Sequence, residues 1–188
     1  MDEREARMAL CCVVEPASTA VTAAVAEHGP AAVLEGLRSR ASRSRWAQRA
    51  RALDLDAVRR ATRRNRLRFV IPGDDEWPAP LGVLATCEPV QEMNGMPFGL
   101  WVKGDVNLAQ VSDRAVAIVG SRAATAYGES VASDLAAGLG GHGVSVVSGG
   151  AYGIDAAAHA GALAGGAPTV AVMAGGLDKP YPPGNATL

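Results

Sequence analysis

The sequence predicts an α/β protein in which a small all-α domain precedes an incomplete parallel β-sheet. Three observations carry this prediction. Residues 1–66 contain only helical patterns separated by turn residues, whereas the second half alternates short apolar runs with helical stretches. Each apolar run after residue 114 ends in a glycine cluster. Short apolar strands that alternate with helices are typical of a parallel sheet covered by helices on both faces.

The first part of the chain is expected to hold five short helices. They are placed at about residues 3–14, 18–27, 31–37, 45–52 and 56–66. Ser18 or Thr19 is a candidate N-cap for the second helix, and Asp54 or Asp56 for the fifth, because their side-chain oxygens accept from free backbone N–H groups. Short helices joined by glycine-containing turns indicate a compact helical domain over residues 1–68.

A turn-rich segment separates this domain from the predicted sheet. It follows a short extended piece at 69–72 and reads Gly73-Asp74-Asp75-Glu76-Trp77-Pro78. Strands are then expected at 100–103, 115–119, 144–147 and 169–173, with helices at about 125–139 and 154–164. We therefore expect a helical domain over 1–68, a linker and the start of the α/β domain over 69–97, and the α/β domain over 98–188. Three parallel strands and one preceding strand are few for such a sheet, so we expect a fragment of a longer protein.

Charge is distributed unevenly along the chain. The formal net charge is −1, yet residues 38–68 hold twelve arginines against Asp54 and Asp56. Their positive charge is either a solvated face or a contact for a polyanion. With 48% hydrophobic and 20% charged residues the chain is not disordered, and no run of 18 apolar residues predicts a membrane span. Three cysteines without a disulfide or zinc pattern, and a start without a secretory leader, indicate a reduced, cytoplasmic protein.

The glycine clusters are the principal candidate site. Their residues are Gly120, Ser121 and Arg122 after the first parallel strand, Ser148, Gly149 and Gly150 after the second, and Gly175 and Gly176 after the third. Ligands bind at the carboxyl edge of such sheets, and glycine lets backbone N–H groups approach an anion. The clusters therefore predict a phosphate-binding ledge, with tight packing of the turns as the alternative. They lack the GxGxxG and P-loop spacings.

Charged, aromatic and amide side chains near these loops are further candidates. Arg122 suits a bidentate phosphate contact, with a salt bridge to an acid as its alternative role. Lys179 and Tyr181 supply a cation and a stacking plane of the kind that single strands bind. Tyr127 and Tyr152 serve as stacking planes or as packing residues. Asn185 binds a phosphate or base, or caps a following helix.

Asp155 and His159 share a face of the helix expected at 154–164. An acid–base dyad is one interpretation. We favour the other, in which Asp155 accepts from free amides in the first helical turn and His159 is packed or hydrogen-bonded. No catalytic residue, metal site or cofactor is expected.

The motifs resemble those of the DNA-processing protein A family (DprA, also called Smf). The resemblance spans the whole chain. It rests on the segments 73–78 with Leu81, 100–105, 119–122 with Tyr127-Gly128, 148–159, and Gly175-Gly176-Leu177-Asp178-Lys179-Pro180-Tyr181-Pro182-Pro183-Gly184-Asn185. Trp77 departs from the tyrosine that is usual in the family.

The resemblance implies a helical domain similar to SAM or helix-hairpin-helix domains, followed by an extended Rossmann-like domain. It implies a cytoplasmic, non-enzymatic protein that binds single-stranded DNA, dimerises and helps to load the RecA recombinase, notably in natural transformation. Arg122 corresponds to the arginine of the family's DNA pocket, whereas Lys179 is a candidate by position. Dimerisation and RecA contacts in the family depend on regions that this sequence lacks.

Two alternative functions stay open. One is a nucleotide-binding enzyme of the Rossmann-like phosphoribohydrolase type. Such enzymes carry a Gly-Gly-x-Gly-Thr loop with an acid close by, where this sequence has Ser148-Gly149-Gly150-Ala151-Tyr152. The other is a truncated product without function.

Overall fold

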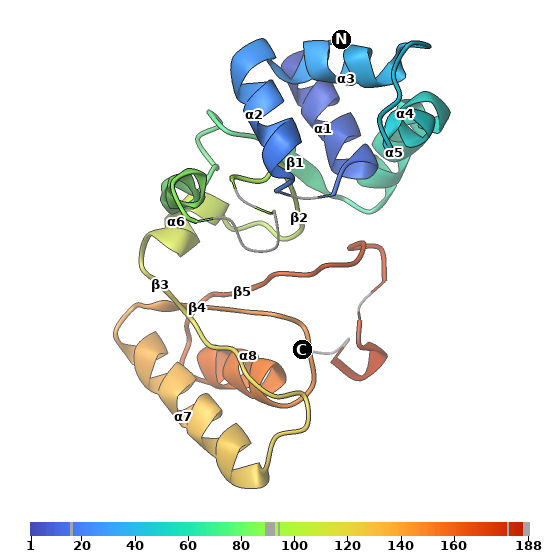
Figure 1. The fold of residues 1–188 in the computed structure, drawn as a ribbon. Helices are drawn as coiled ribbons and strands as arrows, with labels where there is room; N and C mark the ends of the chain where they lie inside the picture. Colours follow the sequence, from blue (N-terminus) through green and yellow to red (C-terminus); the bar gives the residue numbers. More distant parts are fainter. Residues whose placement is uncertain (16, 89–92, 94, 180, 186–188) are drawn as a thin grey trace. The chain divides into compact units, whose positions relative to one another are not determined.

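The chain divides into two compact units, Met1–Gly104 and Asp105–Leu188 (Figure 1). The computed structural model describes residues 1–15, 17–88, 93, 95–179 and 181–185. The boundaries expected after residues 68 and 97 both lie inside the first unit, so that division of the chain stays a prediction. Among the helices of the described residues, none combines the length and the apolar composition needed to cross a bilayer.

The first unit contains the five predicted helices and a two-stranded sheet. Its elements are α1 (Glu3–Val13), α2 (Thr19–His28), α3 (Pro30–Arg38), α4 (Ala47–Ala52), α5 (Leu55–Arg64), β1 (Arg68–Val70), the 3₁₀ helix η1 (Ala79–Ala85) and β2 (Leu100–Val102). Asp2 caps α1 by accepting from Glu5 N at 2.7 Å, and Asp54 caps α5 by accepting from Ala57 N at 2.9 Å. The five helices predicted from the sequence are therefore present, in a unit that also contains β1 and β2.

Apolar faces of α1, α2, α3 and α4 form the core of this unit. Its buried members are Ala6, Ala9, Leu10, Val13, Val14, Val21, Leu34, Leu37, Ala50 and Phe98. A smaller cluster joins α1 to β1 through Met8, Phe69 and Ile71, and the Phe69 ring lies 4.7 Å from that of Trp101. The antiparallel pairing of β1 with β2 thus belongs to the helical unit. The strand predicted at residues 100–103 is present as β2. Its predicted place beside the parallel sheet is wrong, because β2 pairs with β1 instead.

The turn-rich segment 73–78 ties α1 to β1. Asp74 accepts from the backbone N–H of Ile71 at 2.8 Å and from two guanidinium nitrogens of Arg4 at 2.7 and 2.8 Å. The hydrogen bond from Arg4 holds the pKa of Asp74 below its ordinary value. Glu76 forms an ion pair with Arg68. Two of the three acids of this motif, Asp74 and Glu76, are therefore structural in the first unit.

The second unit contains the predicted parallel sheet in the order β3-β4-β5. Its elements are α6 (Leu108–Asp113), β3 (Ala115–Ala117), α7 (Ala126–Gly141), β4 (Ser145–Ser148), α8 (Ile154–Ala164), β5 (Thr169–Ala171) and the 3₁₀ helix η2 (Pro183–Asn185). Val116 lies opposite Val146, and Val146 opposite Thr169. The sequence pattern did not predict α6. Both predicted helices, α7 and α8, are present.

Helices cover one face of this sheet, so the expectation of helices on both faces is wrong for the described residues. In Figure 1, α7 and α8 lie side by side on the same side of the strands. Sequential strand order with right-handed crossovers places both helices on one face. The core between them holds Ile118, Val146 and the alanines 132, 136, 158, 162 and 167. On the other face Val119 and Val172 are exposed at 72% and 65%.

Candidate nucleic-acid interface

The loops that follow β3 and β4 touch at the carboxyl edge of the sheet. The backbone N–H of Ile154 donates to Ser121 O at 3.2 Å and so joins the start of α8 to the first glycine loop. Gly153 has a φ of +73°, and a Cβ there would collide with Ser121 O and Arg122 O. Glycine is required at this position both by its conformation and by the close approach of the first loop.

The segment after β5 closes on the second loop. The Asn185 side-chain amide donates to Gly150 O and to Ala151 O, both at 3.0 Å. The Tyr152 hydroxyl accepts from Gly184 N at 3.3 Å. The first two glycine loops therefore meet, as their strand-end positions predict, and the chain beyond the third cluster reaches the second loop through Gly184 and Asn185. A Cβ at Gly175 would meet open space and one at Gly176 only Asp178, so a contact of the third cluster itself with the other two loops stays a prediction. The role predicted for Asn185 as a cap of a following helix lies outside the described residues.

Buried side chains of the sheet and α8 support the second loop. The Ser148 hydroxyl donates to Ile118 O at 2.6 Å, so it points into the sheet. Asp155 lies in the first turn of α8, as predicted, and accepts from Ala151 N at 3.2 Å, an amide of the loop and not of the helix. His159, 4% exposed, lies with Nε2 2.8 Å from Gly149 O and with Nδ1 2.7 Å from Thr169 Oγ1. The hydrogen-bonded role predicted for His159 is thus confirmed.

The contact with His159 orients the peptide group between Gly149 and Gly150 in the second glycine loop. A carbonyl oxygen only accepts, so Nε2 of His159 carries the proton that it shares with Gly149 O. In a trans peptide the N–H points opposite to the C=O. The N–H of Gly150 is consequently directed away from α8. Thr169, the second partner of His159, was not predicted, because a threonine in a strand is ordinary in sequence.

Arg122 and Tyr181 meet beside the first two glycine loops. The Arg122 guanidinium carbon lies 5.7 Å from the centre of the Tyr181 ring, within the range of a cation–π contact. Arg122 is exposed and Tyr181 is 61% exposed. No described acid forms an ion pair with Arg122, so the alternative of a salt bridge is not observed in this part of the chain. A cation and an aromatic face are thus presented together.

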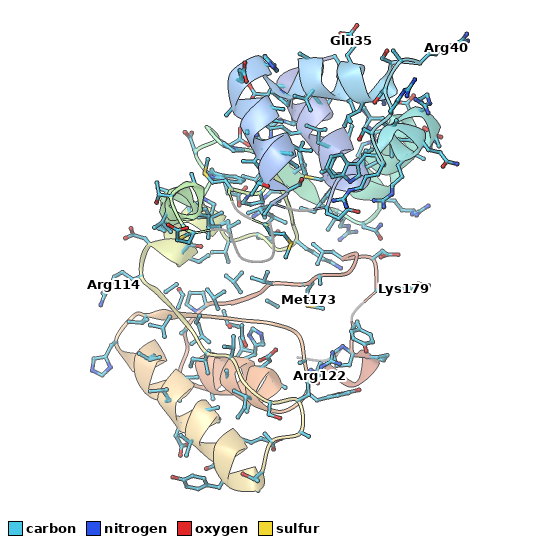
Figure 2. The ribbon with its side chains drawn as sticks, viewed as in Figure 1. Glu35, Arg40, Arg114, Arg122, Met173 and Lys179 are labelled. Atoms are coloured by element: carbon cyan, nitrogen blue, oxygen red, sulfur yellow. The ribbon has the colours of Figure 1, made fainter. Side chains whose placement is uncertain are left out.

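Other candidates lie apart from this pair. Figure 2 shows Lys179 on the outward bend of the segment after β5, away from Arg122. Lys179 is exposed and has no hydrogen bond or ion pair with another described residue. A Cβ at Gly175 would meet open space. Tyr127 and Tyr152 are 79% and 48% exposed, so neither is buried packing.

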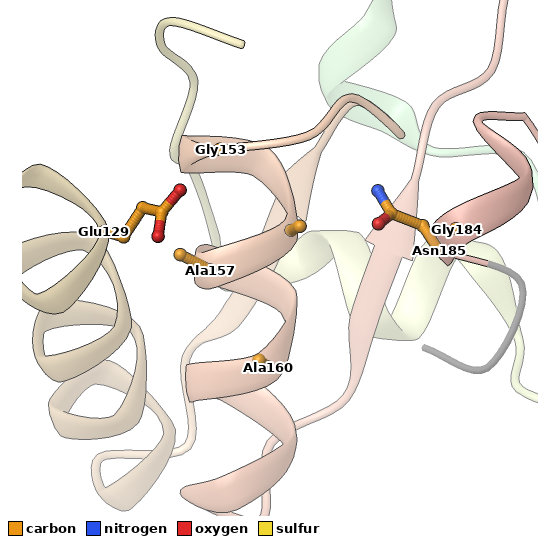
Figure 3. A pocket seen from close by; sticks show the side chains of 7 residues that line it. Glu129, Gly153, Ala157, Ala160, Gly184 and Asn185 are labelled. Atoms are coloured by element: carbon orange, nitrogen blue, oxygen red, sulfur yellow. The ribbon is translucent and has the colours of Figure 1, made fainter. Parts of the chain in front are cut away.

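A shallow hollow of about 360 Å³ lies beside the ledge. Its lining consists of Glu129, Gly153, Ala156, Ala157, Ala160, Gly184 and Asn185. Figure 3 shows the Glu129 carboxylate on one side of α8 and Asn185 on the other. The one charged group of this lining is an acid, which repels phosphate. The hollow therefore does not extend the anion-binding features of the loops.

The comparisons with known proteins agree with this geometry. The model of the family described as DNA recombination-mediator protein A matches residues 68–188. The chain belongs to this family. The resemblance drawn from the sequence motifs is thus confirmed, and the family's α/β fold agrees with the parallel sheet and helices described above.

Relatives within the DNA recombination-mediator protein A family extend the match. A Mycobacterium tuberculosis protein that carries the DprA name is 53% identical over 126 residues, which are 64% of this chain and 32% of that protein. A DNA processing protein DprA of Streptococcus pneumoniae is 40% identical over 108 residues, 56% of this chain and 37% of that protein. The X-ray structure of DprA from Streptococcus pneumoniae aligns with a TM-score of 0.70 at 25% identity, covering 100% of this chain and 62% of that chain. The matched regions thus span about a third of each curated relative.

Proposed function

We propose that this chain binds single-stranded DNA at the three glycine loops, as part of a recombination mediator. The observation that carries the proposal is the exposed pair of Arg122 and Tyr181, whose charge and ring lie together at 5.7 Å. Phosphates of a single strand are attracted to the guanidinium, and its unpaired bases stack on the tyrosine ring. Membership of the DNA recombination-mediator protein A family supports the same assignment.

The glycine clusters complete the proposed site. In this proposal Gly120, Ser121, Gly149, Gly150, Gly175 and Gly176 bring the backbone close to the strand. The contact of Gly149 O with His159 directs the N–H of Gly150 away from α8. In this proposal that N–H donates to a phosphate. Lys179 contacts a neighbouring phosphate of the same strand. Ser148 and Asn185 support the loop through their hydrogen bonds and do not touch the DNA with their side chains.

The protein acts in this proposal as a binding protein without a bond-breaking step. Asp155 and His159, the acid and histidine of the α8 helix that follows the second loop, are 8% and 4% exposed and are engaged in structural hydrogen bonds. We place the protein in the cytoplasm, where its three free cysteines stay reduced. In this proposal its partners are single-stranded DNA, the RecA recombinase and, as the family resemblance implies, a second copy of the protein. The process is DNA recombination, including natural transformation.

Fluorescence anisotropy with labelled oligo(dT) tests the site. Arg122→Ala is expected to weaken binding about tenfold at low salt, and Arg122→Lys is expected to retain part of it, since a lysine keeps the charge but loses the planar fork. Arg114→Ala is the matched control, because Arg114 is an exposed arginine at the opposite end of β3 (Figure 2). Equal affinity of the Arg122→Ala protein and the unaltered protein would refute the site.

Two further measurements test the remaining parts of the proposal. Incubation of the protein with nucleoside monophosphates is expected to release no free base. If free base is released by the unaltered protein and not by Arg122→Ala, the enzyme alternative is favoured.

Loading of purified RecA onto single-stranded DNA is expected to be faster with this chain than without it. Unchanged RecA loading would refute the mediator role for this chain while leaving DNA binding intact.

A further inference from the structure

The outer face of α5 carries arginines for which the first unit provides few acidic partners. Residues 57–73 contain six arginines and no acid. Arg60, Arg63 and Arg64 lie at spacings of three and four on α5 and share one face. All three are exposed, as is Arg66 just beyond the helix. These four residues form what we call the α5 arginine face.

Packing fixes the direction of this face. The inner side of α5 carries Leu55 and Val58, which pack against the core clusters, and Thr62, which accepts from Trp101 Nε1 at 3.1 Å. Arg59 lies on the flank, where it pairs with Glu5 and with Asp56. With the inner side held in this way, the α5 arginine face is left toward solvent.

Stabilisation of α5 does not explain the four arginines of this face. The Arg60 side chain contacts Asp54 at 3.4 Å, whereas the side chains of Arg63, Arg64 and Arg66 have no hydrogen bond or ion pair with another described residue. Like charges at helical spacing repel, and the helix dipole favours cations only in the last turn. Arg60 lies before that turn and Arg66 beyond it, so the dipole explains only two of the four.

Arg66 adds an observation that is independent of charge. Its φ is +54°, in the left-handed region, at the position after the α5 C-cap Asn65. Glycine is the residue that adopts this conformation without strain at a helix end. A non-glycine residue that is held in a strained conformation points to a use for its side chain. Here that side chain is a cation beside the three on the helix.

We infer that the α5 arginine face binds the phosphate backbone of double-stranded DNA. Among its described residues the first unit has no exposed aromatic side chain, because Phe69 and Phe98 are buried and the three tryptophans are half-buried. Single-strand sites use exposed aromatic planes, which are absent from this surface. A surface that offers charge alone reads the backbone, and duplex DNA presents a higher charge density than a single strand. The inference goes beyond the proposed single-strand site and does not depend on it.

Anisotropy of the 188-residue chain with a labelled 30-base-pair duplex and with oligo(dT) tests the inference. Arg63→Ala/Arg64→Ala is expected to weaken duplex binding at least tenfold and to lower the slope of log affinity against log salt by about 2. Oligo(dT) binding is expected to change less than twofold. Arg122→Ala is expected to show the opposite pattern, so failure of one site is distinguishable from failure of the other.

Two controls separate a site from diffuse attraction. Arg63→Lys/Arg64→Lys keeps the charge and is expected to retain duplex binding within about threefold. Arg40→Ala/Arg43→Ala removes two exposed arginines that follow α3 and have no ion pair with a described residue, and it is expected to leave duplex binding unchanged. A loss equal to that of Arg63→Ala/Arg64→Ala would show that only net charge matters and would overturn the inference.

Arg66→Gly distinguishes a binding role from a structural one. Glycine relieves the positive φ, so the thermal midpoint is expected to rise by a few degrees. Duplex affinity is expected to fall about threefold in the same protein. A rise in the midpoint with unchanged affinity for the duplex would remove Arg66 from the face, and unchanged duplex affinity in Arg63→Ala/Arg64→Ala would overturn the inference as a whole.

Discussion

The guanidinium of Arg122 lies over the ring of Tyr181, 5.7 Å from its centre, although 59 positions separate the two residues in sequence. Arg122 comes from the loop after β3 and Tyr181 from the segment that follows β5. The intervening β4 loop contacts both segments, through Gly153 on one side and Gly150 on the other. The pair therefore depends on the first two glycine loops and on the segment that carries Tyr181.

Replacing Tyr181 by leucine is expected to weaken oligo(dT) binding about tenfold. A base that stacks on the ring loses its aromatic plane, which is worth about 1–3 kcal/mol per base. Tyr181→Phe keeps the plane and is expected to bind within about twofold. Both affinities are measured by fluorescence anisotropy, with the thermal midpoint as a check on folding. Equal weakening by leucine and phenylalanine would contradict stacking and indicate a role for the hydroxyl.

Gly153→Ala is expected to destabilise the second unit by about 1–3 kcal/mol. The added Cβ is strained at a φ of +73° and collides with backbone oxygens of the first loop. Gly175→Ala is the control, since its Cβ meets open space and is expected to change stability by less than about 0.5 kcal/mol. Urea unfolding followed by circular dichroism measures both. Equal stabilities of the two variants would show that the first loop moves freely away from Gly153.

Much of the second unit could be predicted because its signals are local. The helix expected at 154–164 is α8 (Ile154–Ala164), and the three glycine clusters do lie at strand ends. Apolar runs and glycines report on backbone conformation within a few residues, which is what periodicity measures. The order of the strands and the convergence of their loops then follow from general rules for parallel sheets.

Features that depend on distant partners were not predictable. The strand at Leu100–Val102 has the same apolar pattern as a strand of the parallel sheet, yet it pairs with Arg68–Val70. Val119 and Val172 are as apolar as buried strand residues, and their exposure depends on which face the helices cover. The bonds from Asn185 to Gly150 O and Ala151 O also join segments far apart in sequence. Composition and spacing contain no information on such pairings.

His159 and Thr169 are expected to be energetically coupled beneath the second loop. Removing the ring by His159→Ala is expected to cost about 2–4 kcal/mol, because it leaves a cavity and an unpaired Gly149 carbonyl. Thr169→Val removes the hydroxyl that lies 2.7 Å from Nδ1 of His159. The double variant is expected to be less destabilised than the sum of the two by about 0.5–3 kcal/mol. Additive effects in urea unfolding would contradict the coupling.

Glu15 is expected to make the stability of the first unit depend on acidity below about pH 4.5. The indole N–H of Trp46, assisted by Arg49 at 3.0 Å, lowers the pKa of Glu15 from 4.5 to about 2. A carboxyl with a lowered pKa stabilises the folded state above its unfolded pKa, and this contribution disappears as the pH falls through the folded value. The advantage of the unaltered protein over Glu15→Gln in urea midpoint should therefore be full at pH 7 and shrink between pH 4.5 and 2. Glu35→Gln, at an exposed α3 carboxyl, is the control. A difference between the unaltered protein and Glu15→Gln that stays constant from pH 7 to pH 2 would show that Glu15 stabilises the unit by packing and not by its charge.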